Sequence, residues 1–486
     1  MLFNSFQFLI FFPVVTLLFF VLPYRFRWQW LLFTSCIFYM AFIPSYISIL
    51  AVTILIDYFA ALWIVSPGIS EKKKKAILSI SILSTCLVLF AFKYFNFFNS
   101  NFAVIAYFFH WNYPVSALKI ILPIGLSFHT FQSLSYVIEV YRGNQKPERH
   151  FGVYALYVMF YPQLVAGPIE RPQNLLHQFY IKHTFNYHRV ADGLKLMLWG
   201  FFKKVVIADR LAIAVNYVYG DPRDFTGVPL IVATVFFAFQ IYCDFSGYSD
   251  IAIGAAQVMG FRLMDNFNRP YFSKSIAEFW KRWHISLSTW FRDYLYIPLG
   301  GNRAKTWRWQ FNLFFTFLVS GFWHGANWTY IIWGGINGFY LITSLWTNRL
   351  RQWFCCITRL HSLPTLHRFL RVGITFSLTC IAWVFFRANN ISDAWYILTH
   401  MFCGLTHGLV VHNSYLGQSL SPNELIIAVL SIMIMEVIHL MQRHRKVRQF
   451  ISEKPLCFRW SVYLFLSLWI LYFGVFESRD FIYFQF

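Results

Sequence analysis

Apolar runs long enough to cross a bilayer recur along this sequence, and they constrain its fold more than any other feature. The first covers about residues 8–22 and the last about residues 460–476. Hydrophobic residues make up 58% of the chain and charged residues only 13%, which lies outside the range of water-soluble globular proteins. Because a helix of about 20 apolar residues spans the hydrocarbon core, we predict an all-α, polytopic membrane bundle of about 10 to 12 spans with re-entrant or interfacial helices.

The lysines and arginines lie in short connections between these runs. They give a net charge of +21 but form no basic arm or basic helix face, so nucleic acid is not an expected partner. Cationic loops stay in the cytoplasm. With the loops at Arg25 and at residues 72–75 inside, the N-terminus, the aromatic segment 95–113 and the C-terminal segment 477–486 are expected outside. The first run lacks a basic start and a cleavage site, so we expect a retained span.

The eight cysteines show no spacing typical of metal ligands, and four of them lie inside apolar runs. Cys355 and Cys356 are adjacent in a basic loop that should be cytoplasmic. We therefore expect neither a metal site nor structural disulfides.

Two segments break the pattern of simple spans. Residues 151–171 contain Tyr-Pro-Gln and Gly-Pro-Ile-Glu-Arg-Pro within an apolar run too short to cross and return. Irregular backbone at membrane depth is tolerated only where it is buried in protein or lines a water-filled cavity. This stretch is therefore expected to be re-entrant or interfacial.

The second segment is the polar stretch 267–310. In it, Leu287, Trp290, Phe291 and Tyr294 recur at helical spacing and predict an amphipathic helix on the cytoplasmic face.

His324 lies at the end of the apolar run 311–319, in Ser-Gly-Phe-Trp-His-Gly-Ala-Asn-Trp at residues 320–328. An ionisable group inside such a run is costly and marks a substrate path or a proton-transfer site. The alternative is a histidine that only forms hydrogen bonds within the bundle. Gly321 and Gly325 flank it and allow close approach of a ligand or another helix.

Residues 228–259 form an apolar run that contains Asp244, Ser246 and Asp250. The two acids are six residues apart, about 600° around a helix, so they do not share a face unless Gly247 disturbs it. Asp244 and Asp250 are expected to pair with cations. In the alternative, Asp244, Ser246 and Asp250 form the working site and the histidines only pack.

Several familiar catalytic motifs are absent: the nucleophile elbow, the phosphate loop, the dinucleotide glycine fingerprint and the zinc helix. His324 and His284 remain. A neutral imidazole is a natural general base for a hydroxyl, and acyl transfer from a thioester to an alcohol needs little else beyond positioning and a dry path.

Each histidine lies in a short motif: Arg-Trp-His-Ile-Ser-Leu-Ser-Thr-Trp at residues 282–290 and Gly-Phe-Trp-His-Gly at residues 321–325. On these motifs rests a resemblance: the sequence resembles the membrane-bound O-acyltransferases, and within them the bacterial alginate O-acetylase branch. Further matching stretches extend it over nearly the whole chain: residues 1–5, 122–128, 163–169, 242–250 and 481–484.

The resemblance implies a helical bundle around a transmembrane tunnel, in a bacterial cytoplasmic (inner) membrane. His324 matches the catalytic histidine, and His284 the second signature position near the cytoplasmic mouth. No cofactor is expected to be permanently bound; the acetyl donor is an acetyl-coenzyme A or acyl carrier protein thioester. The acceptor is an extracytoplasmic polysaccharide, reached directly or through a periplasmic serine-hydrolase-like partner. Similar proteins serve alginate, cellulose, peptidoglycan and, more distantly, teichoic acid.

Three readings follow. The chain is an O-acetyltransferase with His324 as general base, an acetyl or glycan transporter that does no chemistry, or an enzyme working through Asp244.

We expect a single integral membrane domain over residues 1–486, with N-terminal spans in 1–150, a catalytic core in 151–345 and C-terminal spans in 346–486. Trp280, Trp283, Trp290 and Trp323 are expected to be core or interfacial anchors, and Trp283, Trp323 and Asn327 are candidates for lining the substrate path or supporting it.

Overall fold

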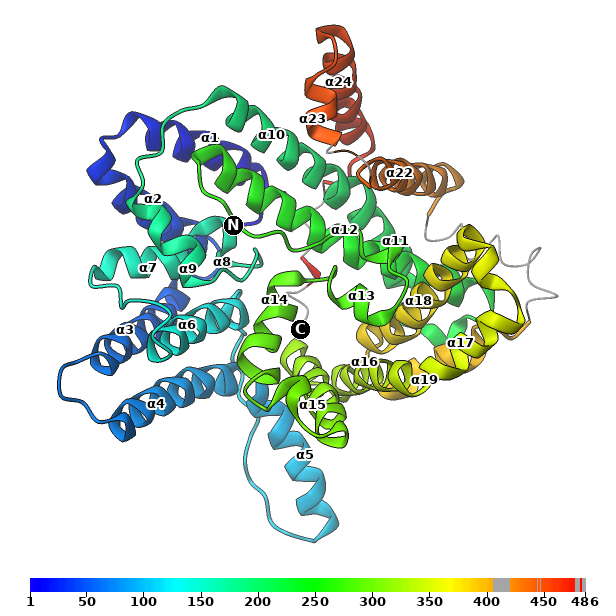
Figure 1. Ribbon diagram of the computed structural model, residues 1–486, viewed down its shortest axis with the longest axis horizontal. Helices are drawn as coiled ribbons and strands as arrows, with labels where there is room; N and C mark the ends of the chain where they lie inside the picture. Colours follow the sequence, from blue (N-terminus) through cyan, green and yellow to red (C-terminus); the bar gives the residue numbers. More distant parts are fainter. Residues whose placement is uncertain (405–419, 444, 446, 477–480, 483–486) are drawn as a thin grey trace. The chain divides into compact units, whose positions relative to one another are not determined.

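The computed structural model describes the chain except for residues 405–419, 444, 446, 477–480 and 483–486 (Figure 1). The described residues form helices joined by turns and loops, with no strand among them. Within them, six helices are long and apolar enough to cross a membrane: Pro44–Ile64, Glu71–Phe108, Val228–Met259, Pro364–Arg387, Pro422–Met441 and Leu456–Phe473. These findings confirm the predicted all-α, multi-pass membrane fold.

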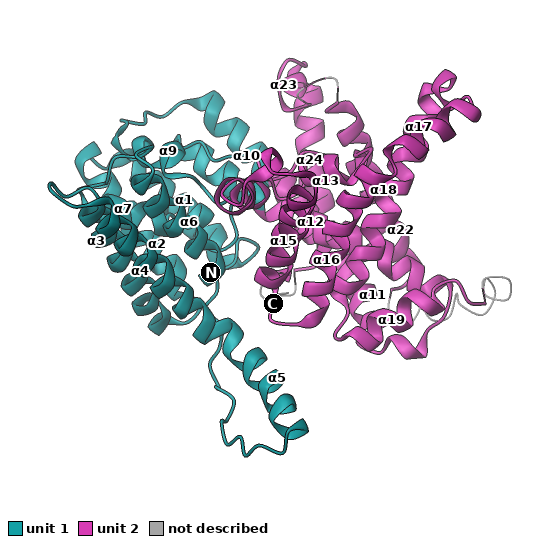
Figure 2. Cartoon of the chain, turned by 60° about the horizontal axis from the view of Figure 1, so that its bottom comes forward, with its two compact units in different colours: residues 1–197, 249–264 teal, residues 198–248, 265–486 magenta. Residues whose placement is uncertain are grey.

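The contacts divide the chain into two compact units, coloured separately in Figure 2. Unit 1 comprises residues 1–197 and 249–264, and unit 2 comprises residues 198–248 and 265–486. The long helix α12 (Val228–Met259) contributes residues to both. The division expected from the sequence, at residues 150 and 345, stays a prediction.

Unit 1 is built around a bundle of helices. Its main elements are α1 (Phe6–Val21), α2 (Tyr24–Met40), α3 (Ile47–Ile64), α4 (Glu71–Leu89), α5 (Phe95–Phe108), α6 (Leu126–Tyr141), α7 (Phe151–Met159) and most of α10 (Tyr187–Phe201). Asp57 of α3 is fully buried, and its carboxylate accepts a hydrogen bond of 2.6 Å from Ser81 Oγ of α4. A buried carboxylate needs such partners, and here it joins two neighbouring helices.

The aromatic segment after α4 is helical through Phe108. A π-helical turn, Phe90–Tyr94, joins α4 to α5, and together they make the continuous apolar helix Glu71–Phe108. The expected span 76–94 is therefore only part of a helix of 38 residues, longer than the bilayer core requires.

The irregular segment between residues 151 and 171 is buried within unit 1. After α7 come the single turn α8 (Tyr161–Leu164), a loop, and the single turn α9 (Pro172–Leu175), and residues 153–170 are all buried. Gly125 approaches this segment with φ at +79°, where a Cβ would lie 2.8 Å from the carbonyl oxygen of Leu164. Protein therefore encloses this irregular backbone; its expected re-entrant or interfacial position stays a prediction.

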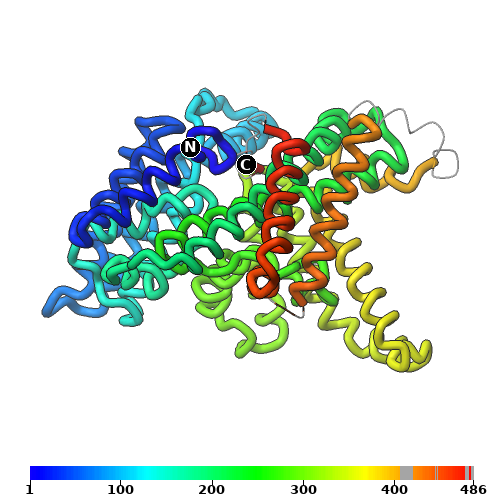
Figure 3. Tube along the Cα trace, turned by 90° about the horizontal axis from the view of Figure 1, so that it is seen from above, coloured from blue at the N-terminus to red at the C-terminus, as the bar shows by residue number. Residues whose placement is uncertain are grey.

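Unit 2 carries both histidines singled out in the sequence. Its main elements are α11 (Asp209–Gly220), α13 (Ile276–Trp280), α14 (Ile285–Phe291), α15 (Thr306–His324), α16 (Trp328–Trp346), α17 (Asn348–Ile357), α18 (Pro364–Arg387), α19 (Ile391–His400), α22 (Pro422–Met441), α23 (Val447–Ser452) and α24 (Leu456–Phe473). Figure 3 shows α22 and α24 side by side, and Trp469 Nε1 of α24 donates a 3.1 Å hydrogen bond to Ser431 Oγ of α22. Most of α24 is exposed, as expected for a helix that faces lipid.

The predicted amphipathic helix is present as α14. Leu287, Trp290 and Phe291 are buried, whereas Arg292 at its end is exposed. A π-helical turn follows, Arg292–Tyr296, in which Tyr294 is half-buried. Helical spacing of large apolar side chains thus identified the buried face correctly.

Candidate functional site

His324 is the last residue of α15, where the chain turns into α16. Its side chain is buried, and Gly325 follows in an extended conformation with φ at −162°. Asn327 then caps α16, because its Oδ1 accepts a 3.0 Å hydrogen bond from the backbone N–H of Thr329. This cap fixes the turn that presents the imidazole.

Aromatic rings surround the imidazole of His324. Ring centroids lie 4.9 Å away for Trp323, 5.0 Å for Trp333 and 5.2 Å for Phe386, each in a steep edge-to-face arrangement. Trp333 comes from α16 and Phe386 from α18. Three helices thus build an apolar box around one titratable group, which excludes bulk water from it.

Two glycines let α15 and α16 come close enough to form this box. A Cβ on Gly321 would strike the carbonyl oxygen of Tyr330 and lie 3.0 Å from Gly334 Cα, and a Cβ on Gly334 would strike the carbonyl oxygen of Phe317. Gly325 likewise faces the Tyr330 ring. The predicted close approach at Gly321 and Gly325 is confirmed, and it is made by a neighbouring helix.

Three tryptophans in contact extend from His324 toward His284. Trp333 lies 5.8 Å from Trp383 with nearly parallel rings, and Trp383 lies 5.0 Å from Trp283. Trp283 directly precedes His284 in the chain. The two histidines that are 40 positions apart in sequence are therefore joined by a short series of aromatic contacts inside unit 2.

His284 occupies a strained turn before α14. Its backbone has φ 42° and ψ 56°, a left-handed conformation that is unfavourable for a residue with a side chain. Asn266 holds this turn: its carbonyl oxygen accepts from the Ile285 N–H at 2.9 Å, and its side-chain Oδ1 accepts from Ser286 Oγ at 2.9 Å. Strain maintained by surrounding contacts is typical of functional positions.

Asn266 also sets the protonation of the His284 ring. His284 Nδ1 lies 3.0 Å from Asn266 Oδ1, an oxygen that can only accept, so Nδ1 carries the proton. The neutral ring then has Nε2 as its basic nitrogen. Burial lowers the pKa of His284 well below its ordinary value, so the ring is neutral at physiological pH.

Asp244 belongs to a buried ion-pair network. Lys204 Nζ lies 2.8 Å from Asp244 Oδ1 and 2.8 Å from Asp209 Oδ1, and all three side chains are at least 95% buried. The second oxygen of Asp244 accepts a 2.9 Å hydrogen bond from the backbone N–H of Ile482. The structure therefore confirms the expected pairing of Asp244 with a cation, which is Lys204.

Ser246 and Asp250 lie in different surroundings, although both are on α12. Ser246 Oγ accepts a 2.9 Å hydrogen bond from Lys203 Nζ. The helix continues unbroken through Gly247, where the lack of a side chain leaves room for the carbonyl oxygen of Gly200. Asp250 belongs to unit 1, whereas Asp244 belongs to unit 2. In the alternative hypothesis, Asp244, Ser246 and Asp250 form the catalytic site. The structure shows that Asp244 and Ser246 are each already bound to a lysine.

The structure adds residues that the sequence reasoning missed. Trp333, Trp383, Phe386 and Asn266 all contact a candidate residue, but only Trp333 had a nearby signal, the Trp-Gly-Gly run at residues 333–335. Of the anticipated tryptophans, Trp283, Trp290 and Trp323 are buried. Within the described ranges, no group of three or more His, Cys, Asp or Glu side chains could hold a metal ion.

Fold and site together define a multi-pass helical membrane protein with two buried histidines linked by tryptophans. Residues 150–386 match the family model for membrane-bound O-acyltransferases. The sequence is 40% identical to the probable alginate O-acetylase AlgI of Azotobacter vinelandii over 82% of this chain and 77% of that protein. It is 36% identical to the peptidoglycan O-acetyltransferase of Helicobacter pylori over 76% and 73%, and 28% identical to the teichoic acid D-alanyltransferase of Bacillus subtilis over 43% and 56%.

The chain belongs to the membrane-bound O-acyltransferase family, and it is an acyltransferase.

Proposed function

We propose that this acyltransferase moves an acetyl group from a cytoplasmic thioester to a hydroxyl group of an extracytoplasmic polysaccharide such as alginate. The observation that carries the proposal is the enclosure of His324 by Trp323, Trp333 and Phe386. A neutral imidazole in a dry, aromatic pocket can accept a hydroxyl proton while water, the competing acceptor of the acetyl group, is kept away. The names of the relatives support acetyl as the group transferred.

His324 acts as the general base in this proposal. The acceptor oxygen attacks the thioester carbonyl carbon while His324 takes the hydroxyl proton. The carbon–sulfur bond then breaks, and the departing thiolate receives that proton, which restores the neutral imidazole. No acyl-enzyme intermediate is required, because donor and acceptor meet at one site.

His284 is assigned to the donor side of the path. The contacts Trp333–Trp383 and Trp383–Trp283 connect the two histidines, and flat aromatic walls suit the extended arm of a thioester donor. The donor is acetyl-coenzyme A or an acylated carrier protein, and the protein lies in a bacterial inner membrane with both termini outside. The resemblance to the family and the distribution of basic loops support these assignments.

The direct acceptor is either the polysaccharide itself or a serine of a periplasmic serine-hydrolase-like partner that passes the acetyl group on. Peptidoglycan and cellulose are the alternative polymers. A passive acetyl or glycan transporter is the competing function. A transporter would not need His324 to accept a proton, whereas the enzyme would.

Substitution of His324 separates these functions. Acetyl esters on the surface polysaccharide would be measured, as alkali-released acetate, in cells that carry His324→Ala or His324→Gln as their only copy. A general base cannot be replaced by either residue, so both variants should lose at least 100-fold in transfer, within the contribution of about 10²- to 10⁴-fold typical of general bases.

The matched control is His188→Ala, which removes an exposed histidine. This control should keep full acetylation, and all variants should reach the membrane at equal levels. Normal acetylation by His324→Gln would overturn the general-base role and favour the transporter.

A further inference from the structure

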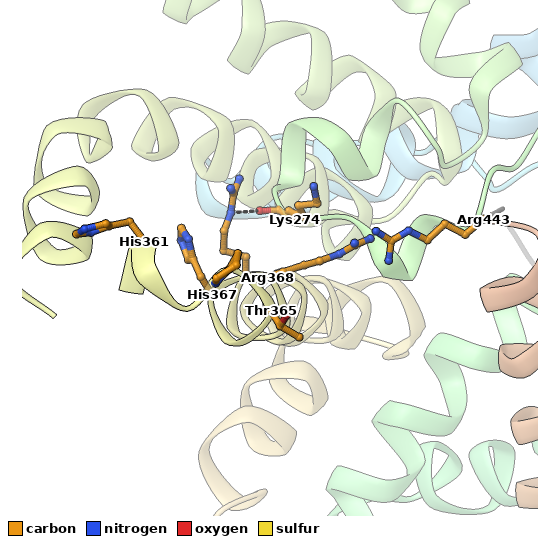
Figure 4. A pocket seen from close by; sticks show the side chains of 8 residues that line it. Lys274, His361, Thr365, His367, Arg368 and Arg443 are labelled. Carbon is orange, nitrogen blue, oxygen red and sulfur yellow. Dashed lines mark hydrogen bonds between the residues drawn. The ribbon is translucent and has the colours of Figure 1, made fainter. Parts of the chain in front are cut away.

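A basic cavity of about 690 Å³ opens at the start of α18, apart from the two histidines of the candidate site. Figure 4 shows the side chains that line it. The first turns of α18 supply Arg368 and Arg371, the segment before α13 supplies Lys274, and the connection after α22 supplies Arg443. Three stretches distant in sequence thus bring four cationic side chains to one cavity.

No acidic side chain is among the eight residues that line this cavity. The part of the chain that includes α17 and α18 also lacks acidic residues, because no aspartate or glutamate occurs between Asp293 and Asp393. The positive end of the α18 helix dipole also lies here, where cations are least favourable. No carboxylate among the lining residues therefore balances this positive charge; the nearby Glu278 carboxylate accepts from the Lys274 backbone N–H and pairs with Arg282.

Membrane orientation alone does not require this arrangement. Basic residues orient a protein when they lie anywhere in a cytoplasmic loop. They need not converge, and like charges brought together repel one another. In Figure 4, Arg368 and Arg443 nevertheless point toward one another across the cavity.

Specific contacts hold the walls of the cavity. Arg371 Nε donates a 3.2 Å hydrogen bond to the carbonyl oxygen of Lys274, which ties α18 to the segment before α13. The two histidines of the lining both contact Cys355 of α17: His367 Nε2 lies 3.5 Å from its sulfur, and His361 Nδ1 lies 3.3 Å from its carbonyl oxygen. The site is therefore organised by hydrogen bonds between α17, α18 and the segment that carries Lys274.

We propose that this cavity binds a ligand bearing at least two phosphate groups. Guanidinium groups match phosphate oxygens in paired hydrogen bonds, and a lysine adds a point charge. The positive end of the α18 helix dipole favours the same anion. Four cations around one cavity exceed what a single monoanion would balance.

The position of the cavity fits two sources of such a ligand. The candidate span α18 begins beside it and the candidate span α22 ends beside it, so it lies where two spans meet the same aqueous face. A soluble donor with two or more phosphates and a phospholipid headgroup with two phosphates both reach such a place. The inference concerns binding only and does not depend on the proposed acetyl transfer.

Binding would be measured on the purified full-length protein in nanodiscs of phosphatidylcholine, with adenosine 3′,5′-bisphosphate and pyrophosphate as probes. The test variant is Arg368→Gln/Arg371→Gln. The control is Arg349→Gln/Arg351→Gln, which removes the same charge from the exposed helix α17. The test variant should bind at least tenfold more weakly than the wild type, and the control should bind like the wild type.

A second arm identifies the source. In nanodiscs that contain cardiolipin, a phospholipid with two phosphate groups, the lipid retained through purification would be counted by native mass spectrometry. Binding of the bisphosphate in neutral lipid assigns the cavity to a soluble ligand; loss of retained cardiolipin only in the test variant assigns it to lipid. Equal thermal stability of all variants would show that folding is intact. If neither probe nor lipid distinguishes the test variant from the control, the proposal is wrong.

Discussion

The Asp244 carboxylate accepts a 2.9 Å hydrogen bond from the backbone N–H of Ile482, 238 residues further along the chain. This bond places the neighbouring Phe481 ring 5.8 Å from Phe245, which in turn meets the His284 ring edge-to-face at 4.6 Å. A carboxylate in the middle of α12 thereby fixes part of the wall behind His284. Residues 477–480 and 483–486 of the segment expected outside the membrane lie outside the described residues, but Phe481 and Ile482 are buried.

Asp244→Asn should destabilise the protein by about 3 kcal/mol, because it leaves buried Lys204 with only one carboxylate. Thermal unfolding in detergent would measure this loss. The matched control, Asp221→Asn, removes an exposed carboxylate and should leave stability unchanged. If Asp244→Asn abolished transfer while stability stayed at the wild-type value, Asp244 would have a direct chemical role instead.

Gly334→Ala should lower stability by about 1 to 3 kcal/mol and reduce activity, because the new methyl group would push α16 away from Phe317 and Gly321 of α15. The next residue provides the control. A Cβ on Gly335 would lie 3.8 Å from the Phe314 ring, an ordinary contact, so Gly335→Ala should be neutral or stabilising. Unfolding midpoints and acetyl transfer of the two variants would be compared; equal effects would contradict the close helix approach.

Asn266→Ala should slow acetyl transfer about tenfold, because the His284 ring and Ser286 lose their shared acceptor at a net cost of about 1 to 2 kcal/mol. The pH profile of the rate should also change, since Asn266 no longer fixes the proton on Nδ1. Asn268→Ala removes an exposed amide two residues later and serves as the control. An unchanged pH profile in Asn266→Ala would show that Asn266 does not position the ring.

The stability of the protein should depend on His284 below about pH 6.5, the ordinary pKa of histidine. Burial lowers the pKa of this ring in the folded state, so between the two pKa values the unfolded state binds one more proton. Stability therefore falls as the pH falls through this window, by at most about 1.4 kcal/mol per pH unit. Unfolding midpoints between pH 7.5 and 5 should decline less steeply in His284→Gln than in the wild type; parallel curves would contradict the lowered pKa.

Features that depend on local sequence were predictable. Hydropathy over about 20 residues located α3, α12, α18, α22 and α24, and helical spacing identified the buried face of α14. The motifs around His284 and His324 pointed to the family that the relatives then established. The extent of α5 was missed because a run rich in aromatic residues carries no clear signal for where a helix ends.

The sequence by itself determined that this chain is a helical membrane protein and an acyltransferase with two prominent histidines, since hydrophobic runs and short motifs are properties of neighbouring residues. Only the tertiary structure decided what those histidines touch. Asn266 beside His284, the tryptophans between the histidines, and Lys204 beside Asp244 all bring together different elements of the chain. Such contacts arise from packing through space, which no local pattern encodes.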